Sequence, residues 1–570
     1  MTTLDRRTLL ATGTAGAATL AVATGLDGPA GAAAPTGAAD DPRASGRVFR
    51  HGVASGDPLP DAVLIWTRVT PTAASRPGSG HGPRVEVRWE VARDADFRRV
   101  VRRGRFQTGP SRDHTVKVDV TGLEPATWYH YRFRYDDAVS PVGRARTAPA
   151  SDASPDHLRF GVVSCANLQA GWFSAYRGLA ARDDLHAVLH LGDYLYEYGP
   201  GEYGYGIDDE DIRSHQPAHE MLTLADYRQR HAQYKQDPDL QALHAKYPWV
   251  ITWDDHEVTN DAYREGAENH NPDLGEGDFH RRRARAHRAY DEWMPVRMDG
   301  TAGLRDGDRL FRRLQFGRLA EISMLDLRTY RDEQVARPLP EPLPVADAAV
   351  SDPDRTIVGR QQLDWLKQSL SRGRAQWKII GNPVMIAPVD FGGLPDELID
   401  PVNDVTGLLP RDGLPYNVDQ WDGYTDDRRE VFTHIRDHQV SDALFVTGDI
   451  HSGWACELPY DASTYPAGDS AGVEFVCSSV TSNNLKDLTG TPAHTTSTAV
   501  EQTILANNRH IKYLNFDDHG FSVLDVTPLR AQMDWYVIGD RADRDTSITW
   551  SVSYATRTGT GRVEQVGEPV

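Results

Sequence analysis

Four short polar clusters, each standing directly after a short apolar run, constrain the fold of this chain more than any other feature of its sequence. The runs cover residues 158–163, 187–191, 249–253 and 443–447. Short, partly β-branched apolar runs are typical of strands that are buried on both faces of a sheet. The clusters that follow them are Ser164-Cys165, Gly192-Asp193-Tyr194-Leu195-Tyr196, Asp254-Asp255-His256-Glu257 and Gly448-Asp449-Ile450-His451. Because catalytic side chains in α/β folds gather at the carboxyl ends of strands, the sequence predicts one metal site assembled from four distant segments.

The size and composition of the chain are those of a soluble globular protein with room for two domains. Its 570 residues exceed one ordinary core, and 39% of them are hydrophobic and 25% charged. The formal net charge of −20 argues against nucleic acid or an anionic membrane surface as a resting partner. Three cysteines are too few for a disulfide scaffold. Cys456 and Cys477 could pair or be buried separately, which leaves Cys165 as the odd thiol.

The N-terminus has the form of a twin-arginine export signal. Arg6 and Arg7 precede a weakly hydrophobic stretch rich in Ala, Thr, Gly and Leu, and small residues at 30–34 close it. We therefore expect residues 1–36 to be a signal peptide and the twin-arginine export machinery to be a partner, with the protein secreted or held in the cell envelope. Elsewhere no stretch approaches the roughly 20 apolar residues that a transmembrane helix requires.

The segment that follows the signal differs in kind from the rest of the chain. Alternating stretches at 85–92, 115–120 and 128–135 predict half-exposed strands separated by turns, and no convincing helical pattern interrupts them. Residues 123–131 resemble the tyrosine-corner segment of a fibronectin type III sandwich. We therefore expect residues 46–148 to form a small all-β fibronectin-like or Ig-like domain.

From Leu158 onward, strand-like runs alternate with helical patterns, which predicts an α/β fold. The pattern favours two sheets that pack face to face under covering helices, so residues 156–560 should form a two-sheet α/β sandwich. The stretch 388–422 is expected to be a long loop, either a lid or a segment folded against the core. The expected helices are 224–247, 278–293, 360–373 and 426–439, the expected hairpin turns at Gly317, and residues 504–538 are assigned to the second sheet.

Each cluster offers a different kind of metal ligand. Asp193 has two oxygens that can bridge two cations, and Tyr196, three positions later, can turn back toward the same ion. Tyrosinate together with thiolate favours a strongly Lewis-acidic ion such as ferric iron. On an extended segment Asp449 and His451 point the same way, so they could reach adjacent ions. In the remaining cluster a carboxylate can bind the second ion while the adjacent His256 faces the substrate.

The ordered set of motifs resembles the metallophosphoesterase superfamily. The Gly-Asp-x-x-Tyr pattern at 192–196 is similar to that of purple acid phosphatases. More specifically, the chain from about Phe49 to about Pro528 resembles the PhoD-like, or alkaline phosphatase D, family, on the four clusters and on the segments 49–58 and 325–331. This resemblance implies an exported phosphoesterase with one ferric ion and calcium nearby, preceded by a small β domain.

The resemblance also implies a ligand set. Where the wider superfamily has Asn and His, this chain has Asp255 and Asp449, and oxygen in place of nitrogen favours calcium over zinc. One or two calcium ions are expected. The implied ligands of iron are Cys165, Asp193, Tyr196 and His451, and those of calcium are Asp193, Asp255 and Asp449, with Asn260 or Asn382 as a further oxygen ligand.

His256 is the candidate catalytic residue. It would protonate, or donate a hydrogen bond to, the leaving oxygen of a phosphate ester placed across the cations. The alternative is a core histidine fixed by a neighbouring carboxylate. His231 is expected to be structural, whereas Arg328 and Arg331 could either contact phosphate bidentately or form ion pairs.

The expected function is therefore hydrolysis of phosphate monoesters and diesters at a centre of Fe³⁺ and Ca²⁺. An alternative within the same family is an iron-dependent phospholipase D that acts on phosphatidylcholine-like diesters, because the same cations would bind either substrate and the loops over the site would discriminate. A third possibility from another class is a non-catalytic secreted metal-binding protein.

Overall fold

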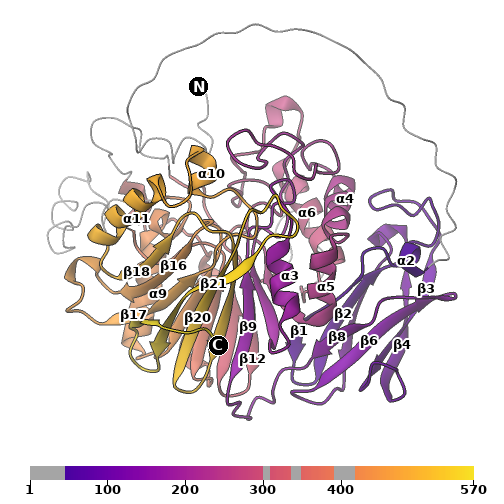
Figure 1. The fold of residues 1–570 in the computed structure, drawn as a ribbon, viewed down its shortest axis with the longest axis horizontal. Coiled ribbons are helices and arrows are strands. Elements are labelled where there is room, and N and C mark those ends of the chain that lie inside the picture. The colour runs from indigo at the N-terminus through magenta and orange to yellow at the C-terminus, as the bar shows by residue number, and fades with distance from the viewer. Residues whose placement is uncertain (1–44, 299–308, 336–347, 390–416) are drawn as a thin grey trace, which may run out of the picture.

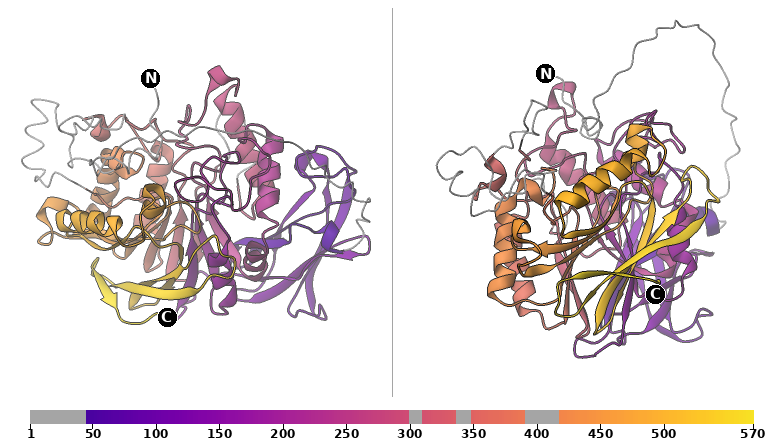
Figure 2. Two further views of the ribbon diagram at one scale, coloured as in Figure 1. Left: turned by 45° about the horizontal axis from the view of Figure 1, so that its top comes forward. Right: turned by 60° about the vertical axis from the view of Figure 1, so that its left-hand side comes forward.

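The computed structural model describes residues 45–298, 309–335, 348–389 and 417–570 (Figures 1 and 2). The expected signal peptide lies outside the described residues, and so do residues 390–416 of the expected long loop. Within the described part of the chain, no helix has the length and apolar character needed to cross a membrane.

A ten-stranded sheet forms the backbone of the fold. Its strand order is β22-β21-β20-β19-β9-β10-β11-β1-β2-β5. The central strands β9, β10, β11 and β1 run parallel to one another, and the flanking pairs are antiparallel. The strands are β1 (Val53–Leu59), β2 (Ala62–Arg68), β5 (Thr115–Thr121), β9 (Leu158–Val163), β10 (Ala187–Leu191), β11 (Pro248–Thr252), β19 (Gly520–Val526), β20 (Arg530–Ile538), β21 (Ile548–Arg557) and β22 (Val563–Val566).

A seven-stranded sheet packs against the ten-stranded one. Its order is β12-β13-β14-β15-β17-β16-β18, and β12 and β13 form the antiparallel hairpin expected around Gly317. A buried apolar cluster that includes Val162, Leu189, Ile379 and Leu444 fills the space between the two sheets. The strands are β12 (Arg312–Phe316), β13 (Ala320–Met324), β14 (Trp377–Asn382), β15 (Ala443–Thr447), β16 (Gly453–Pro459), β17 (Ser470–Val476) and β18 (Ile511–Asn515).

Helices cover the outer face of each sheet, so the predicted α/β sandwich is confirmed. One helical layer packs on the ten-stranded sheet through a core that joins Leu179, Tyr227 and Leu243 to Trp249 of β11. The other layer packs on the seven-stranded sheet. The first comprises α3 (Ser174–Ala181), α4 (Leu224–Tyr234), α5 (Pro238–Lys246) and α6 (Phe279–Trp293), and the second α7 (Arg360–Arg372), α9 (Thr425–Asp437), α10 (Leu485–Thr489) and α11 (Thr496–Asn507).

Two expectations need correction. The helix expected over 224–247 is two helices, because Pro238 cannot continue α4 and instead begins α5, which the side chain of Asp237 caps. The segment 504–538 is divided between the sheets, since β18 joins one while β19 and β20 join the other. For Cys456 and Cys477 both possibilities had been left open, and the structure shows the second, since both residues are buried and free.

The N-terminal part is all-β, as expected, with short helical turns only at its edges. Tyr129 forms the predicted tyrosine corner, because its hydroxyl accepts a hydrogen bond of 2.8 Å from the backbone N–H of Glu124. One face of this domain is a sheet ordered β4-β3-β6-β7, with β8 also paired to β6. The opposite face, β1, β2 and β5, belongs to the ten-stranded sheet. The separate strands are β3 (Val85–Ala92), β4 (Val100–Thr108), β6 (Trp128–Tyr135), β7 (Ala138–Val139) and β8 (Gly143–Arg146).

Candidate metal centre

The four polar clusters of the sequence meet at one place between the two sheets. They follow β9, β10, β11 and β15, so two of the sheets contribute to a single site. Gly448 makes this approach possible, since a Cβ atom there would lie 2.7 Å from the Cβ of Ser164 at the end of β9. The ends of β9 and β15 therefore lie in close contact at the site.

The backbone leaves these strands in an unusual conformation. Four of the expected ligands have positive φ angles: 58° at Cys165, 56° at Asp193, 59° at Asp449 and 53° at His451. The left-handed region is costly for residues other than glycine, and such residues cluster at functional sites where the surrounding structure holds them. The turn after each strand is thus specified by tertiary structure, and it directs the side chain into the site.

The first group of possible metal ligands joins sulfur, oxygen and nitrogen. One ligand atom from each of Cys165, Asp193 and His451 lies within 4.8 Å of the others, and all three side chains are buried. The hydroxyl of Tyr196 donates a hydrogen bond of 2.9 Å to Oδ2 of Asp193 and lies 3.3 Å from Nε2 of His451. All four residues expected to bind iron are therefore neighbours.

Two neighbouring residues orient this group. His451 donates from Nδ1 to the backbone carbonyl of Asn483 at 2.7 Å, which leaves its Nε2 facing Tyr196. Ser482 donates to the Tyr196 hydroxyl at 2.6 Å. Neither Ser482 nor Asn483 was predicted from the sequence.

The environment of the Cys165 thiol and the Tyr196 phenol disfavours their ionised forms. Burial raises the pKa of Cys165 well above its usual value, and the charge of Asp193 raises it further. The same two causes raise the pKa of Tyr196. A strongly Lewis-acidic cation would be needed to ionise both groups, which fits the donor set to such an ion.

The second group consists of carboxylates alone. Oxygen atoms of Asp193, Asp254, Asp255 and Asp449 lie within 4.8 Å of one another, and all four residues are buried. Asp193 belongs to both groups. Four buried carboxylates at this separation repel one another strongly unless cations lie among them, and oxygen donors are those that calcium prefers.

Arg328 provides part of the compensating charge within this group. Its guanidinium contacts Asp254 at 2.6 and 2.9 Å and Asp419 at 2.9 and 3.0 Å. It also lies 3.7 Å from Asp255 and 4.0 Å from Asp449. Arg328 was expected either to contact phosphate or to form ion pairs, and the described structure contains the ion pairs. The same is true of Arg331, which contacts Asp419 at 2.7 Å.

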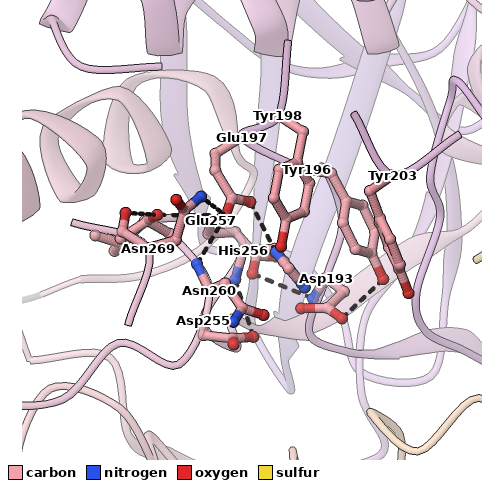
Figure 3. Close-up of polar contacts among 12 residues, drawn as sticks. Asp193, Tyr196, Glu197, Tyr198, Tyr203, Asp255, His256, Glu257, Asn260 and Asn269 are labelled. Carbon is pink, nitrogen blue, oxygen red and sulfur yellow. Dashed lines mark hydrogen bonds and ion pairs between the residues drawn. The ribbon is translucent and has the colours of Figure 1, made fainter. Parts of the chain in front are cut away.

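His256 lies beside the shared carboxylate, as Figure 3 shows. Its Nδ1 atom contacts Oε2 of Glu197 at 2.7 Å, its ring lies 4.1 Å from that of Tyr196, and its buried Nε2 has no hydrogen-bond partner. Burial alone lowers the pKa of His256, but the carboxylates of Asp255 and Glu197 outweigh it and raise the pKa to about 10. Cations bound at Asp255 would oppose that rise.

Asn260 and Asn382, the two candidates for a further oxygen ligand of calcium, differ in whether their side-chain oxygen has a hydrogen-bond partner. Asn260 is buried near Asp255, its backbone N–H donates to Glu197 at 2.8 Å, and its Oδ1 has no hydrogen-bond partner. That orphan oxygen suits a cation ligand. Asn382 has both ends of its amide engaged, because Nδ2 donates to Val384 and Oδ1 accepts from Trp421 at 3.1 Å. Asn260 therefore fits the expected role better.

Several residues that organise the site were not predicted. Glu257 accepts hydrogen bonds from the backbone N–H groups of Asp193, Tyr194 and Asp254, and so ties the ends of β10 and β11 together. Glu197 directly follows the tyrosine motif and Glu257 ends the Asp-Asp-His-Glu motif, so their positions in the sequence could have identified them as residues of the site. Asp419 lies 91 positions after Arg328, and no sequence motif connects it with the site.

His231 lies outside the centre. It is buried with its ring stacked on Trp293 at 6.3 Å, and burial lowers its pKa well below the usual value. This placement agrees with the structural role expected for it.

Two facing sheets whose strands end in a thiol, a phenol, imidazoles and carboxylates form a candidate metal site of the kind that metal-dependent hydrolases use. The chain belongs to the PhoD-like phosphatase family: the PhoD-like phosphatase domain matches residues 160–535 and the PhoD-like phosphatase N-terminal domain matches residues 33–149. The resemblance found in the sequence is thereby confirmed.

Relatives support this assignment along most of the chain. Alkaline phosphatase D of Bacillus subtilis (strain 168) is 36% identical over 515 residues, which cover 90% of this chain and 81% of that protein. A solved structure described as "Structure of PhoD" superposes with a TM-score of 0.79 at 34% identity and covers 92% of both chains. The protein is therefore a hydrolase of phosphoric esters, homologous to alkaline phosphatase D.

Proposed function

We propose that the protein is an exported phosphoesterase that hydrolyses phosphate monoesters and diesters at a centre of one ferric ion and one or two calcium ions. One observation carries this proposal: Asp193 belongs both to the group of sulfur, nitrogen and oxygen donors and to the group of carboxylates. A shared carboxylate is what a site for two unlike cations needs.

The assignment of the metals follows from the donors. Cys165, Tyr196 and His451 would hold iron together with Asp193, and Asp255, Asp449 and Asn260 would complete an oxygen site for calcium. Bound there, the cations would neutralise the phosphoryl oxygens and lower the pKa of a water molecule. Among the described residues, Arg328 is paired with carboxylates, so phosphate binding is assigned to the cations.

The residues of the chain would handle the leaving group. Nε2 of His256 is buried at the edge of the carboxylate group, and Glu197 holds the ring through Nδ1. The contact with Glu197 favours the doubly protonated imidazole, which can donate a proton to the departing alkoxide. His256 is thus the proposed general acid.

Metal analysis of protein purified without added ions tests the centre. We expect one equivalent of iron, one or two equivalents of calcium, and a visible charge-transfer band that Tyr196→Phe and Cys165→Ser both remove. Unchanged colour in both variants, or zinc in place of iron, would contradict the assignment.

The substrate range needs a separate measurement. Phosphate release from a chromogenic monoester, hydrolysis of a chromogenic diester and choline release from lecithin can be compared on the same preparation. We expect hydrolysis of both chromogenic esters. Choline release as the dominant activity would instead make the protein a phospholipase D.

A further inference from the structure

The separate sheet of the N-terminal domain carries a basic outer face on a protein whose net charge is −20. Side chains alternate between the two faces of a strand, and the pairing of β3, β4, β6 and β8 therefore identifies the outward set. It contains seven arginines against two glutamates. The arginine face, as we name this set of arginines, consists of Arg88, Arg103, Arg105, Arg132, Arg134, Arg144 and Arg146, and the glutamates are Glu86 and Glu90.

The arginines stand directly opposite one another. Arg88 of β3 is paired with Arg105 of β4 on one side and with Arg134 of β6 on the other, which makes a row of three like charges across adjacent strands. Neighbouring strands lie about 4.8 Å apart, and like charges at opposed positions destabilise a sheet. Folding alone gives no reason for such a row.

The two glutamates leave this charge incompletely compensated. Glu86 contacts Arg105 at 3.1 Å, and Glu90 contacts Arg132 at 2.7 Å and Arg134 at 3.1 Å. The other four arginines form no ion pair with any residue that the structure describes. These four are Arg88, Arg103, Arg144 and Arg146, of which the first two are exposed.

Two exposed valines flank the arginine face. Val100 and Val142 are 39% and 43% exposed, and they are among the few exposed large hydrophobic residues of the described chain. Val100 begins β4 opposite Ala92, in the row of the sheet that continues through His130 to Arg144. Val142 directly precedes β8, which lies on the opposite side of the sheet from β4, so the two valines flank the face on its two edges.

We propose that the arginine face docks the protein on an anionic phospholipid surface. A guanidinium group binds phosphate bidentately, and an array of such groups spread over four strands matches a surface of many lipid phosphates, whereas a linear polyanion is better matched by a groove. The valines at the two edges would enter the headgroup region. Figure 1 places β3, β4 and β6 at the margin of the molecule, where a flat surface can reach them.

The negative net charge of the protein does not prevent this contact. Screening limits electrostatic interactions to about 8 Å at physiological ionic strength, so the local charge of the approaching face decides the interaction. The distribution of charge on the folded chain, and not its net charge, therefore decides whether an anionic membrane surface can bind.

Docking and hydrolysis use different parts of the protein. The metal ligands follow strands of the two large sheets, whereas the arginine face lies on β3, β4, β6 and β8. The two activities can therefore fail independently, and hydrolysis serves as a control for folding.

Cosedimentation of the full chain with lipid vesicles tests the proposal. We expect binding to vesicles of phosphatidylglycerol and phosphatidylcholine, little binding to phosphatidylcholine alone, and strong weakening by salt. The triple variant Arg88→Glu, Arg103→Glu, Arg105→Glu should lose about tenfold or more in vesicle affinity while hydrolysing a soluble ester normally. A matched control changes three exposed arginines elsewhere, Arg281→Glu, Arg372→Glu and Arg509→Glu, and should bind nearly as the parent does.

Three results would overturn the proposal. The first is absence of binding to the anionic vesicles. The second is an equal loss of affinity in the control variant, which would indicate an effect of net charge. The third is binding of soluble polyphosphate through the three arginines without binding of vesicles, which would assign the face to a soluble polyanion.

Discussion

The Nε2 atom of His256 is the clearest sign of an absent partner among the single residues of the site. It is buried without a hydrogen bond, a condition that costs about 1–3 kcal/mol unless a ligand meets it. If it protonates the leaving oxygen, His256→Ala should lower kcat about 10²- to 10⁴-fold for an alkyl phosphate. The loss should be much smaller for a nitrophenyl phosphate, whose leaving group departs without a proton.

Steady-state kinetics with the two substrates measures this difference. His438→Ala, a change to an exposed histidine in the turn after α9, is the control and should leave both rates unchanged. An equal loss of kcat for the two leaving groups would mean that His256 acts by positioning or by binding.

The two donor groups should also be separable by single substitutions. Tyr196→Phe removes a ligand that only the iron group contains, so it should reduce iron content and visible absorption more than calcium content. Asp255→Asn should do the reverse, because Asp255 lies in the carboxylate group. Elemental analysis and the absorption spectrum of both variants check this. Equal loss of iron in the two variants would contradict the division of the site.

The ligands were predictable because each follows an apolar run, and the residues that hold them were not. Cys165, Asp193 and Asp449 come directly or almost directly after a buried strand, a signal that the sequence carries locally. Ser482 and Asn483 stand in a polar stretch without periodicity or charge. Ser482 contacts Tyr196, which is 286 positions away, and Asn483 contacts His451, which is 32 positions away. Only the fold establishes these contacts.

At the scale of the elements, the site depends on how closely β9 and β15 approach. A Cβ at Gly448 would lie 2.7 Å from that of Ser164, a distance that forces one strand end to move. Gly448→Ala should therefore lower the free energy of unfolding by about 1–3 kcal/mol and reduce metal content. Thermal unfolding and metal analysis measure both effects. Gly567→Ala, where the added Cβ has nothing within 4 Å, should change neither.

The pKa of Glu257, which ties the ends of β10 and β11 together, should make the stability of the protein depend on bound metal and on pH. In the metal-free protein, burial and the nearby Asp193 raise the pKa of Glu257 to about 8, so the folded protein binds a proton that the unfolded chain, with its ordinary carboxyl pKa, has lost. Between these two pKa values the metal-free protein should become less stable as pH rises.

Cations bound to Asp193 should suppress this loss of stability, because their charge favours the ionised form of Glu257. We therefore expect the difference in Tm between the metal-loaded and the chelated protein to widen from pH 5 to pH 8. Calorimetry with and without a chelator measures it. A difference that is constant or that narrows with pH would show that Glu257 does not control the response.

The types of elements were predictable, and their connections were not. The apolar runs, the β12–β13 hairpin and three of the four expected helices could be read from periodicity alone. Within the remaining expected helix, 224–247, Pro238 was a visible break, but the apolar pattern on both sides of it favoured a single helix. The parallel pairing of β1 with β11 joins residues that are nearly 200 positions apart. No local pattern distinguishes β1 from an edge strand of a separate domain.

This pairing makes the N-terminal domain and the α/β sandwich one structure at the scale of the whole molecule. Arg228 of α4 forms two contacts of 2.7 Å with Glu292 of α6 and also donates to the backbone of Ser111 in the N-terminal domain, and Trp66 of β2 donates to the backbone of Glu292. The shared sheet and these buried contacts predict that both parts unfold in one transition.

Glu292→Gln tests this coupling. Removing one charge of a buried pair leaves Arg228 uncompensated, which should lower the free energy of unfolding by about 3–5 kcal/mol. Because the contact joins the two parts, a calorimetric scan should show one transition that moves to lower temperature as a whole. Glu564→Gln, in an exposed pair with Arg557, should change stability by about 1 kcal/mol or less. Two separate transitions, or a shift confined to one of them, would mean that the shared sheet does not couple the domains.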